Sequence, residues 1–297
     1  MKARVIVVEK RTAYGRFVEE ERDPRARLLV RRKDPSVRSW LEGHREHQRT
    51  LETVKSVLAK LGVHVHWVKR AHAQFDASDA DLVVAVGGDG TLLAASNNLD
   101  DVPILGVNSA PRHSVGFFCA AQRDTFAKLV VAALEHRLPS VTLSRMKVSV
   151  NGRVRSSRVL NDALFAHVSP AATSRYVLEH GDHSEEQRSS GFWIGPPAGS
   201  TAAQRSAGGR VQSLTSRRLQ LVVREPYVPF GKPYRMARCL IRDGEKVIAR
   251  SNMDDAALWL DGPHREVPVR LGDVLEFSAS DKPLQVLGIK SRRQKDG

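Results

Sequence analysis

The segment Gly87-Gly88-Asp89-Gly90-Thr91 holds the residues of this chain whose types and spacing point most directly to chemistry. It closes an apolar stretch, residues 81–86, with the composition of a buried strand, and it opens a helix-like stretch over residues 91–96. Glycines permit positive φ angles and let backbone amides come close to a bulky ligand. The N–H groups and the dipole at the start of a helix favour a phosphate group. The segment therefore predicts a phosphate-binding loop between a strand and a helix.

Asp89 is the single acidic residue in this glycine loop. A loop that only holds phosphate does not need a carboxylate, whereas phosphoryl transfer needs a group that orients the attacking hydroxyl and accepts its proton. The pattern lacks the Lys-Ser/Thr ending of the P-loop, and it is not the Gly-x-Gly-x-x-Gly pattern of dinucleotide-binding folds. A second interpretation is a tight strand-to-helix turn in which Asp89 only caps the helix.

The length of the chain, 297 residues, allows one large domain or two ordinary ones. No apolar run approaches 20 residues, and the run near the start is too short for a signal peptide, so we expect a soluble protein with no membrane partner. Cys119 and Cys239 show no metal-ligand spacing. We therefore expect no metal site built by protein ligands, no structural disulfide, and a cytoplasmic location.

The net charge of +14 suits a nucleic acid, an anionic membrane or a small polyphosphate as partner. Only 6% of the residues are aromatic, and basic clusters such as Arg31-Arg32-Lys33 are not interleaved with rings that could stack on bases. We therefore expect no specific nucleic-acid partner, and we interpret most of the charge as a solvated basic surface.

The first part of the chain alternates strand and helix patterns. After a first strand, residues 10–35 read as a long polar stretch, and two helices follow, one ended by Gly62. The helices are expected at residues 39–61 and 124–135, and the strands at residues 4–9, 63–68, 81–86 and 102–107. This alternation predicts an α/β N-terminal domain, residues 1–139, with a mostly parallel open sheet and helices on both faces.

The longer expected helix carries His44 and His47, three residues apart. Two histidines at this spacing could bind a metal ion, but the sequence offers no third ligand. We expect both on a basic face of the helix that meets solvent or a partner.

After Pro139 the pattern changes to short β-like runs separated by turns such as Asn151-Gly152, Asp243-Gly244 and Asp261-Gly262. The runs are residues 146–150, 154–164, 174–179, 191–194, 219–223, 237–241, 246–250, 256–260 and 274–277. They predict a mostly antiparallel, β-rich C-terminal domain, residues 140–297, whose last residues could pack back on the first domain.

Three more motifs follow the glycine loop in a fixed order: Gly106-Val107-Asn108, Asn161-Asp162, and the small-residue stretch 199–209. Together with the loop, in this order and spacing, they resemble the NAD kinases, and the likeness runs over residues 4–289. Within that family the chain is most similar to the divergent, mitochondrial-type branch. The segments that carry this finer likeness are residues 108–117, 189–191 and 224–226.

The resemblance implies transfer of the γ-phosphoryl group of ATP to the 2′-hydroxyl of the adenosine ribose of NAD, which gives NADP. It implies that Asp89 is the catalytic acid/base and that the rest of the loop faces nucleotide phosphates. It also implies that Asn161 and Asp162 hold NAD. The remaining residues that it assigns are Gly87, Gly88, Gly90 and Thr91 for the phosphates, Thr201, Ala202 and Ser206 for the adenine pocket, and Phe117 for a ring packed near that pocket.

The resemblance further implies Mg²⁺ held mainly by the phosphates of ATP and by water, and a homo-oligomer, expected to be a dimer. Four positions depart from the family pattern. Asp162 replaces a glutamate, Ser190 an aspartate, Ala203 an aromatic residue and Ala198 a hydroxyl-bearing residue. The sequence leaves open whether NADH is also an acceptor and whether polyphosphate can replace ATP.

Two other functions stay open at this point. A lipid kinase of the diacylglycerol or sphingosine type shares the glycine loop and a β-rich second domain, but Asn161-Asp162 and residues 200–209 favour a nucleotide acceptor. A basic nucleic-acid-binding protein without catalytic activity would explain the charge, but it would not need Asp89.

Overall fold

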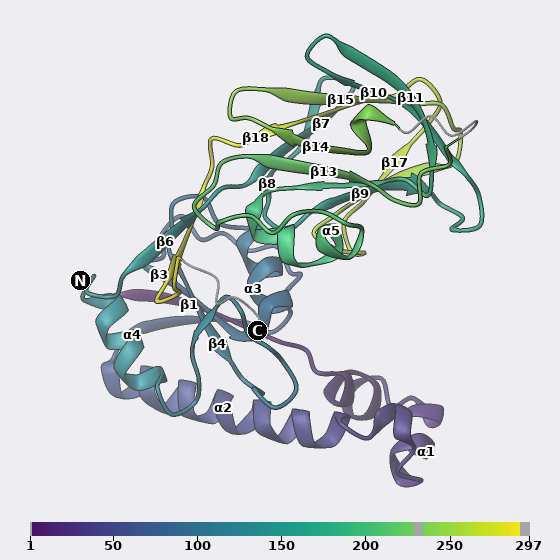
Figure 1. Ribbon diagram of the computed structural model, residues 1–297. Coiled ribbons are helices and arrows are strands. Elements are labelled where there is room, and N and C mark those ends of the chain that lie inside the picture. Colours follow the sequence, from purple (N-terminus) through teal and green to yellow (C-terminus); the bar gives the residue numbers. More distant parts are fainter. Residues whose placement is uncertain (1, 229–233, 292–297) are drawn as a thin grey trace. The chain divides into compact units, whose positions relative to one another are not determined.

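The computed structural model describes residues 2–228 and 234–291 (Figure 1). The chain forms two compact units. The first unit comprises Met1–Val141 and Gln285–Lys290, and the second comprises Thr142–Leu284 and Ser291–Gly297. Within the described residues, no helix has both the length and the apolar character needed to cross a membrane.

The first unit is built on a mostly parallel sheet of seven strands among the described residues. Its order is β2-β1-β3-β4-β19-β6, with β5 paired to β4. The central strand β3 is buried at all six positions, as expected where helices cover both faces of a parallel sheet. The strands are β1 (Arg4–Glu9), β2 (His64–Val68), β3 (Leu82–Gly87), β4 (Ile104–Asn108), β5 (Cys119–Ala121), β6 (Ser140–Leu143) and β19 (Leu284–Leu287).

Helices cover both faces of this sheet. The helices α2 (Trp40–Leu61) and α4 (Phe126–Leu134) share one apolar core cluster with Leu105 and Val107 of β4 (Figure 1). Gly106, between these two residues, therefore faces the other side. A Cβ atom there would lie 3.0 Å from Leu92 of α3 (Asp89–Ser96), which places α3 on the second face. The expected α/β class, with a mostly parallel sheet, is confirmed.

The polar stretch between β1 and α2 contains helical elements that the sequence analysis did not predict. They are the π-helix η1 (Gly15–Glu20), α1 (Pro24–Arg31) and the short 3₁₀ helix η2 (Pro35–Val37). The last two begin with an aspartate followed by proline, which is a strong start signal. Asp23 accepts a hydrogen bond from the Ala26 amide at 2.6 Å. The apolar periodicity is weak because α1 buries only Ala26.

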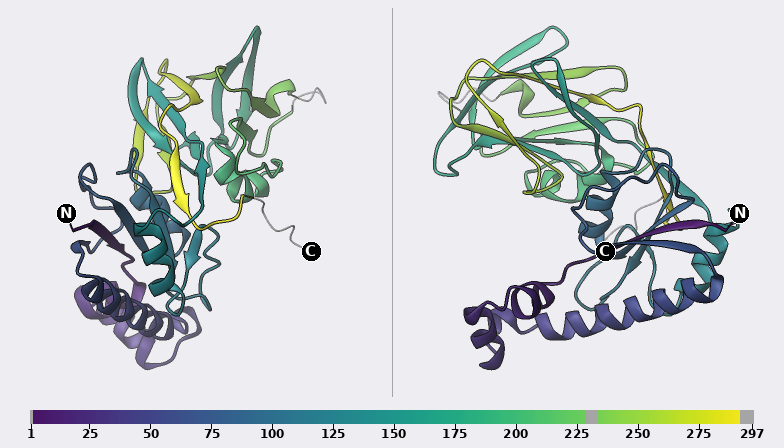
Figure 2. Two further views of the ribbon diagram at one scale, coloured as in Figure 1. Left: turned by 90° about the vertical axis from the view of Figure 1, so that its left-hand side faces the viewer. Right: turned by 180° about the vertical axis from the view of Figure 1, so that it is seen from behind.

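The second unit packs two antiparallel sheets, each of six strands among the described residues, into a sandwich (Figure 1, Figure 2). The orders are β11-β10-β15-β18-β7-β8 and β14-β13-β12-β9-β16-β17. Rings of Phe165 and Phe192 from one sheet meet Tyr176 and Phe277 from the other, with centroids 5.2–5.8 Å apart. The expected antiparallel, β-rich second part is confirmed.

Most of these strands lie at the β-like runs of the sequence. They are β7 (Met146–Val150), β8 (Arg153–Val159), β9 (Ala163–His167), β10 (Ser174–His180), β11 (His183–Ser189), β12 (Phe192–Gly195), β13 (Leu219–Val223), β14 (Arg238–Ile241), β15 (Lys246–Ser251), β16 (Ala256–Leu260), β17 (Glu266–Val269) and β18 (Val274–Ala279). Three short helical elements complete the unit: η3 (Pro197–Thr201), α5 (Ala203–Ser206) and η5 (Arg235–Ala237).

One predicted strand of this unit was wrong, and two strands, β11 and β17, were not predicted. Residues 154–164 do not form one strand, because the chain breaks between β8 and β9, where Asp261 takes the amide hydrogens of Leu160 and Asn161. The strand β11 was missed because its residues, His183–Ser189, are almost all polar. It pairs with β10 along its whole length.

Candidate active site

The glycine loop lies at the carboxyl end of β3, between the ends of β1 and β4. The strand ends at Gly87, and α3 begins at Asp89 with Gly88 as its extended N-cap residue. Ligands of open α/β sheets bind at this edge, and α3 adds the N–H groups of its first turn. Sequence and topology therefore place the loop where a phosphate would bind.

The loop glycines are needed for space rather than for positive φ angles, which corrects the sequence analysis. None of Gly87, Gly88 and Gly90 has a positive φ angle. A Cβ atom on Gly87 would lie 2.1 Å from Thr91 Oγ1, and one on Gly88 would lie 2.3 Å from Ser114 Oγ. A Cβ atom on Gly90 would meet no heavy atom of the described chain within 4 Å. The backbone at Gly90 is therefore open to a ligand.

The Asp89 carboxylate does not cap its own helix. No side chain caps the start of α3. Instead Asp89 Oδ2 accepts a hydrogen bond from the Phe117 amide at 2.9 Å, and Oδ1 accepts one from the Phe118 amide at 2.7 Å. These two bonds fix the direction of the carboxylate. Each carboxylate oxygen has a further lone pair with which it could accept a bond from a substrate hydroxyl.

The other residues predicted for this unit, Thr91 and Phe117, differ in exposure. Thr91 is 5% exposed and its hydroxyl lies against Gly87, so its side chain supports the loop from inside. Phe117 is 38% exposed, and its ring stands edge-on to Phe118 at a centroid distance of 5.0 Å. Asn108 shapes the segment before Phe117, since its side-chain amide donates to the Ser114 carbonyl at 2.9 Å.

In the second unit, Asn161 and Asp162 occupy the break between β8 and β9. One buried carboxylate, that of Asp261, organises this break. Its Oδ1 accepts hydrogen bonds from the amides of Leu160 at 3.1 Å, Asn161 at 2.7 Å and Asp162 at 3.3 Å. The Asp261 amide in turn donates to the Asp162 carbonyl at 2.9 Å.

The Asp162 carboxyl group is a weaker acid than an ordinary aspartate. Burial raises its pKa to about 7, and the neighbouring charge of Asp261 acts in the same direction. Burial also raises the pKa of Asp261, against the effect of the backbone amides and of Arg265. The Asn161 side-chain amide donates to Asp162 Oδ2 at 2.8 Å, which orients both groups. Near neutral pH the pair can therefore both donate and accept hydrogen bonds.

The segment after β12 closes tightly on Asn161. Cβ atoms at Gly195 and Gly199 would lie 2.5 and 1.7 Å from the Asn161 carbonyl oxygen, so only glycine fits at these two positions. The Gln204 side chain donates to the same carbonyl at 3.4 Å. This segment carries the three residues predicted for the adenine pocket. Thr201 is half-buried, and Ala202 and Ser206 are exposed.

Two functional features escaped the sequence analysis. Asp261 reads as a turn residue because Gly262 follows it, and no local signal shows that it is buried. His44 and His47 were expected on a basic face that meets solvent or a partner, but they are 9% and 2% exposed and contact groups of their own unit. They bind polar groups of the first unit, and the described residues contain no cluster of three potential metal ligands.

Comparisons with known proteins agree with this arrangement. Residues 27–138 match the family model described as the ATP-NAD kinase N-terminal domain. A probable NADH kinase of Oryza sativa subsp. japonica is 35% identical over 278 residues, which cover 86% of this chain and 85% of that protein. The mitochondrial NAD kinase 2 of Homo sapiens is 38% identical over 134 residues, which cover 41% of this chain and 30% of that protein.

The fold of the whole chain is also found in a solved structure. The crystal structure of an NAD kinase from Archaeoglobus fulgidus in complex with ATP is similar with a TM-score of 0.67 and 21% sequence identity. The similarity covers 97% of this chain and 94% of that one. At this level of identity the likeness shows the fold.

Proposed function

The chain belongs to the NAD kinase family, and we propose from this that it transfers the γ-phosphoryl group of ATP to the 2′-hydroxyl of the adenosine ribose of NAD. The product is NADP. The observation that carries the proposal is the Asp89 carboxylate, which two backbone amides hold in a fixed direction inside a glycine loop at a helix start.

Asp89 is proposed as the acid/base. A ribose hydroxyl is a poor nucleophile, so a carboxylate within hydrogen-bond reach orients it and accepts its proton. The bond from O2′ to the γ-phosphorus forms while the bond from phosphorus to the β,γ-bridging oxygen breaks, and ADP leaves. The amides at the start of α3 and the open backbone at Gly90 would face the phosphate charge.

Asn161 and Asp162 are proposed to hold the NAD acceptor. An amide and a carboxyl group that can donate and accept suit the hydroxyl groups of a ribose. Asp162 is one methylene shorter than the family's glutamate, and Asp261 fixes the backbone that carries it. Thr201, Ala202, Ser206 and Phe117 are proposed for the adenine end.

Mg²⁺ is proposed as the metal that accompanies ATP. The described residues contain no group of three His, Cys, Asp or Glu side chains around one position, so the donor set fits an ion held by phosphate oxygens and water. Bound in this way, Mg²⁺ would neutralise the charge of the transferred phosphoryl group. We also propose that the protein acts in the cytoplasm as a homodimer.

An assay of the full chain with ATP and Mg²⁺ tests the proposal. NADP formation is followed with an NADP-specific dehydrogenase, with NAD and NADH as separate acceptors because both share the adenosine ribose. Diacylglycerol and sphingosine serve as acceptors in parallel. Formation of NADP or NADPH supports the proposal, and phosphorylation of a lipid alone would overturn it.

A further inference from the structure

Two buried polar side chains of α2 reach one residue at the end of β4. His47 and Thr50 are each 2% exposed, and both contact Ser109, which follows the strand and is itself 1% exposed. His47 Nδ1 lies 2.8 Å from Ser109 Oγ, and the Thr50 hydroxyl donates to the Ser109 carbonyl at 3.1 Å. The later buried positions of α2 are apolar: Leu51, Val54 and Leu58. Polar burial is therefore concentrated where the helix meets the end of a strand.

Ser109 connects this helix to the first residue of the glycine loop. Its amide donates to the Gly87 carbonyl at 2.8 Å, and its hydroxyl lies 3.4 Å from the same oxygen. Gly87 ends β3, and Asp89 follows two residues later. A contact from α2 to Ser109 therefore acts on the backbone that carries Asp89.

His47 reaches the end of β1 as well. Its ring makes a hydrogen bond to the backbone of Lys10, whose amide donates to the Val86 carbonyl of β3 at 2.9 Å. Burial lowers the pKa of His47 to about 4, and the charges of Lys10 and His44 act in the same direction. The ring is therefore neutral, with one donor and one acceptor. A neutral ring can serve both contacts, with the donor on one nitrogen and the acceptor on the other.

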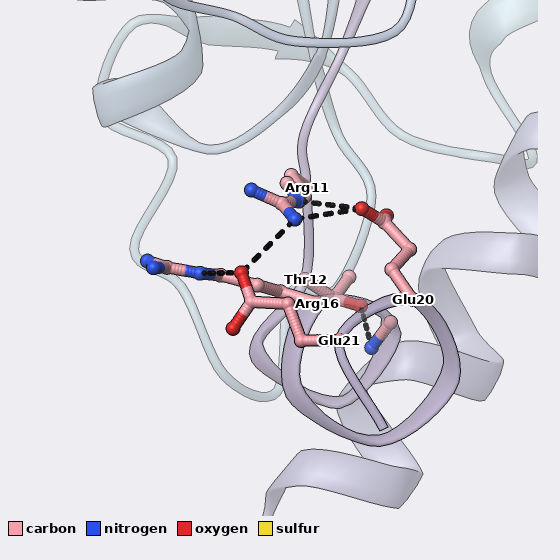
Figure 3. A network of polar contacts seen from close by, with 6 residues as sticks. Arg11, Thr12, Arg16, Glu20 and Glu21 are labelled. Carbon is pink, nitrogen blue, oxygen red and sulfur yellow. Dashed lines mark hydrogen bonds and ion pairs between the residues drawn. The ribbon is translucent and has the colours of Figure 1, made fainter. Parts of the chain in front are cut away.

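The segment after Lys10 is anchored separately. Arg11 donates to Glu20 at 2.9 Å and to Glu21 at 3.2 Å, and Arg16 donates to Glu21 at 2.9 Å (Figure 3). His44, one turn before His47, lies 2.7 Å from the Thr12 hydroxyl. Side-chain contacts thus anchor the segment that follows Lys10, and His47 contacts Lys10 itself.

We propose that His47 is a positioning residue, which ties the ends of β1 and β4 together on either side of Gly87 and so fixes the loop that carries Asp89. This role rests on the proposed function of that loop. An apolar side chain would fill the same volume without the desolvation cost of a buried ring with two polar nitrogens. The ring instead makes directional bonds to two of the three strand ends around the loop. Misplacement of a reacting group by about 1 Å costs on the order of 10²-fold in rate.

Three variants on α2 test the proposal by their steady-state kinetics. His47→Leu removes both hydrogen bonds and keeps an apolar volume, and we expect kcat to fall about 10-fold or more, with the KM for NAD within about 2-fold. His47→Gln keeps a donor and an acceptor and should restore most of kcat. Val54→Ala is the control, because it leaves a cavity in the apolar core beneath the same helix without removing a side-chain hydrogen bond. It should lose stability and keep kcat.

Hydrogen exchange of the amides at residues 84–93 gives a readout that needs no reaction. We expect faster exchange there in His47→Leu than in Val54→Ala at matched unfolding free energy. If His47→Leu does not fold, Ser109→Ala removes the Nδ1 contact from the other side and should lower kcat in the same way. Wild-type kcat in folded His47→Leu, or equal losses in Val54→Ala, would overturn the positioning role. A wild-type protein that forms no NADP or NADPH, but whose loop exchanges faster in His47→Leu, would overturn the proposed function alone.

Discussion

The glycine loop of the first unit and the Asn161-Asp162 break of the second unit hold their carboxyl groups in opposite ways. Asp89 receives one backbone amide on each oxygen, beside a glycine that leaves the backbone open. Asp162 is buried next to a second buried carboxylate, Asp261, which takes the local backbone amides for itself. The first arrangement directs a carboxylate and keeps it accessible. The second arrangement raises the pKa of Asp162 and stabilises the break between β8 and β9.

The largest effect should follow from the loss of the Asp89 carboxylate. In Asp89→Asn the new amide group cannot accept the proton of the substrate hydroxyl. Its NH₂ group would also face the N–H group of Phe117 or Phe118, which donates to Asp89 in the wild type. We expect kcat to fall about 10²-fold or more, with the melting temperature within a few degrees of wild type. Steady-state kinetics and thermal unfolding measure both. Wild-type turnover in this variant would contradict the catalytic role.

A smaller effect, on stability and acceptor binding, is expected at Asp261. Asp261→Ala leaves the amides of Leu160, Asn161 and Asp162 without their acceptor, and a buried unsatisfied group costs about 1–3 kcal/mol of unfolding free energy. The KM for NAD should rise and the KM for ATP should stay constant.

Asp243→Ala is a surface control for Asp261→Ala, measured by urea unfolding and kinetics, although of the two residues only Asp261 has a positive φ angle. Asp243 also precedes a glycine in a turn, but it is about half exposed and pairs with Arg217 at the surface. Such a pair contributes little to stability. Equal losses in the two variants would show that Asp261 acts only as a turn residue.

The pH dependence of stability should differ in sign between the two regions. Asp162 has a raised pKa in the folded state, so folding binds protons, and its contribution to stability is lost progressively as pH rises from about 4 to about 7. His47 has a lowered pKa, so its contribution is lost as pH falls from 6.5 towards 4. Each slope is at most about 1.4 kcal/mol per pH unit.

Unfolding free energies between pH 4 and 8 test this difference. Asp162→Asn should remove a fall in stability that accompanies rising pH between about 4 and 7, and His47→Gln should remove the opposite fall, which accompanies decreasing pH from 6.5 towards 4. Parallel curves for wild type and Asp162→Asn would contradict the raised pKa of Asp162.

The smallest effect on the fold is expected at Gly90. A methyl group there meets no neighbour, and alanine favours a helix over glycine by up to about 1 kcal/mol, so Gly90→Ala should keep or slightly raise stability. If phosphate approaches this backbone, the KM for ATP should rise. Gly88→Ala is the comparison, because its methyl group would collide with Ser114 and lower stability. An unchanged KM for ATP in Gly90→Ala would place the phosphate elsewhere.

The sequence predicts those parts of each region whose residues are neighbours along the chain. The strand, loop and helix around Asp89 are contiguous, and the apolar pattern on both sides of the loop predicts them directly. Asn161-Asp162 could be recognised through the family resemblance, although the pattern around it suggested an unbroken strand. Asp89 lies at the start of α3, the helix that the pattern predicts at the end of the loop, and Asn161 and Asp162 lie within the residues predicted as a strand.

The residues that hold these motifs in place could not be found in this way. Asp261 acts on Asn161 from far along the chain, and His47 acts on Ser109 from another helix. A buried aspartate before a glycine looks like a turn residue, and buried histidines on an amphipathic helix look like surface residues. Their roles depend on hydrogen-bond partners that only the folded chain brings close.

The position of β19 has a consequence for how the protein is made. Val286 of this strand pairs with Ile104 of β4, and β19 separates β4 from β6 in the sheet. When residues 1–143 have been synthesised, every strand of this sheet except β19 has therefore been made. The position between β4 and β6 is filled only after residues 142–284, nearly all of the second unit, have been translated. Until then β6 lacks its neighbour in the sheet, and the edge of β4 is covered only where β5 pairs with it. Unpaired strand edges are where newly made chains associate with each other or with chaperones.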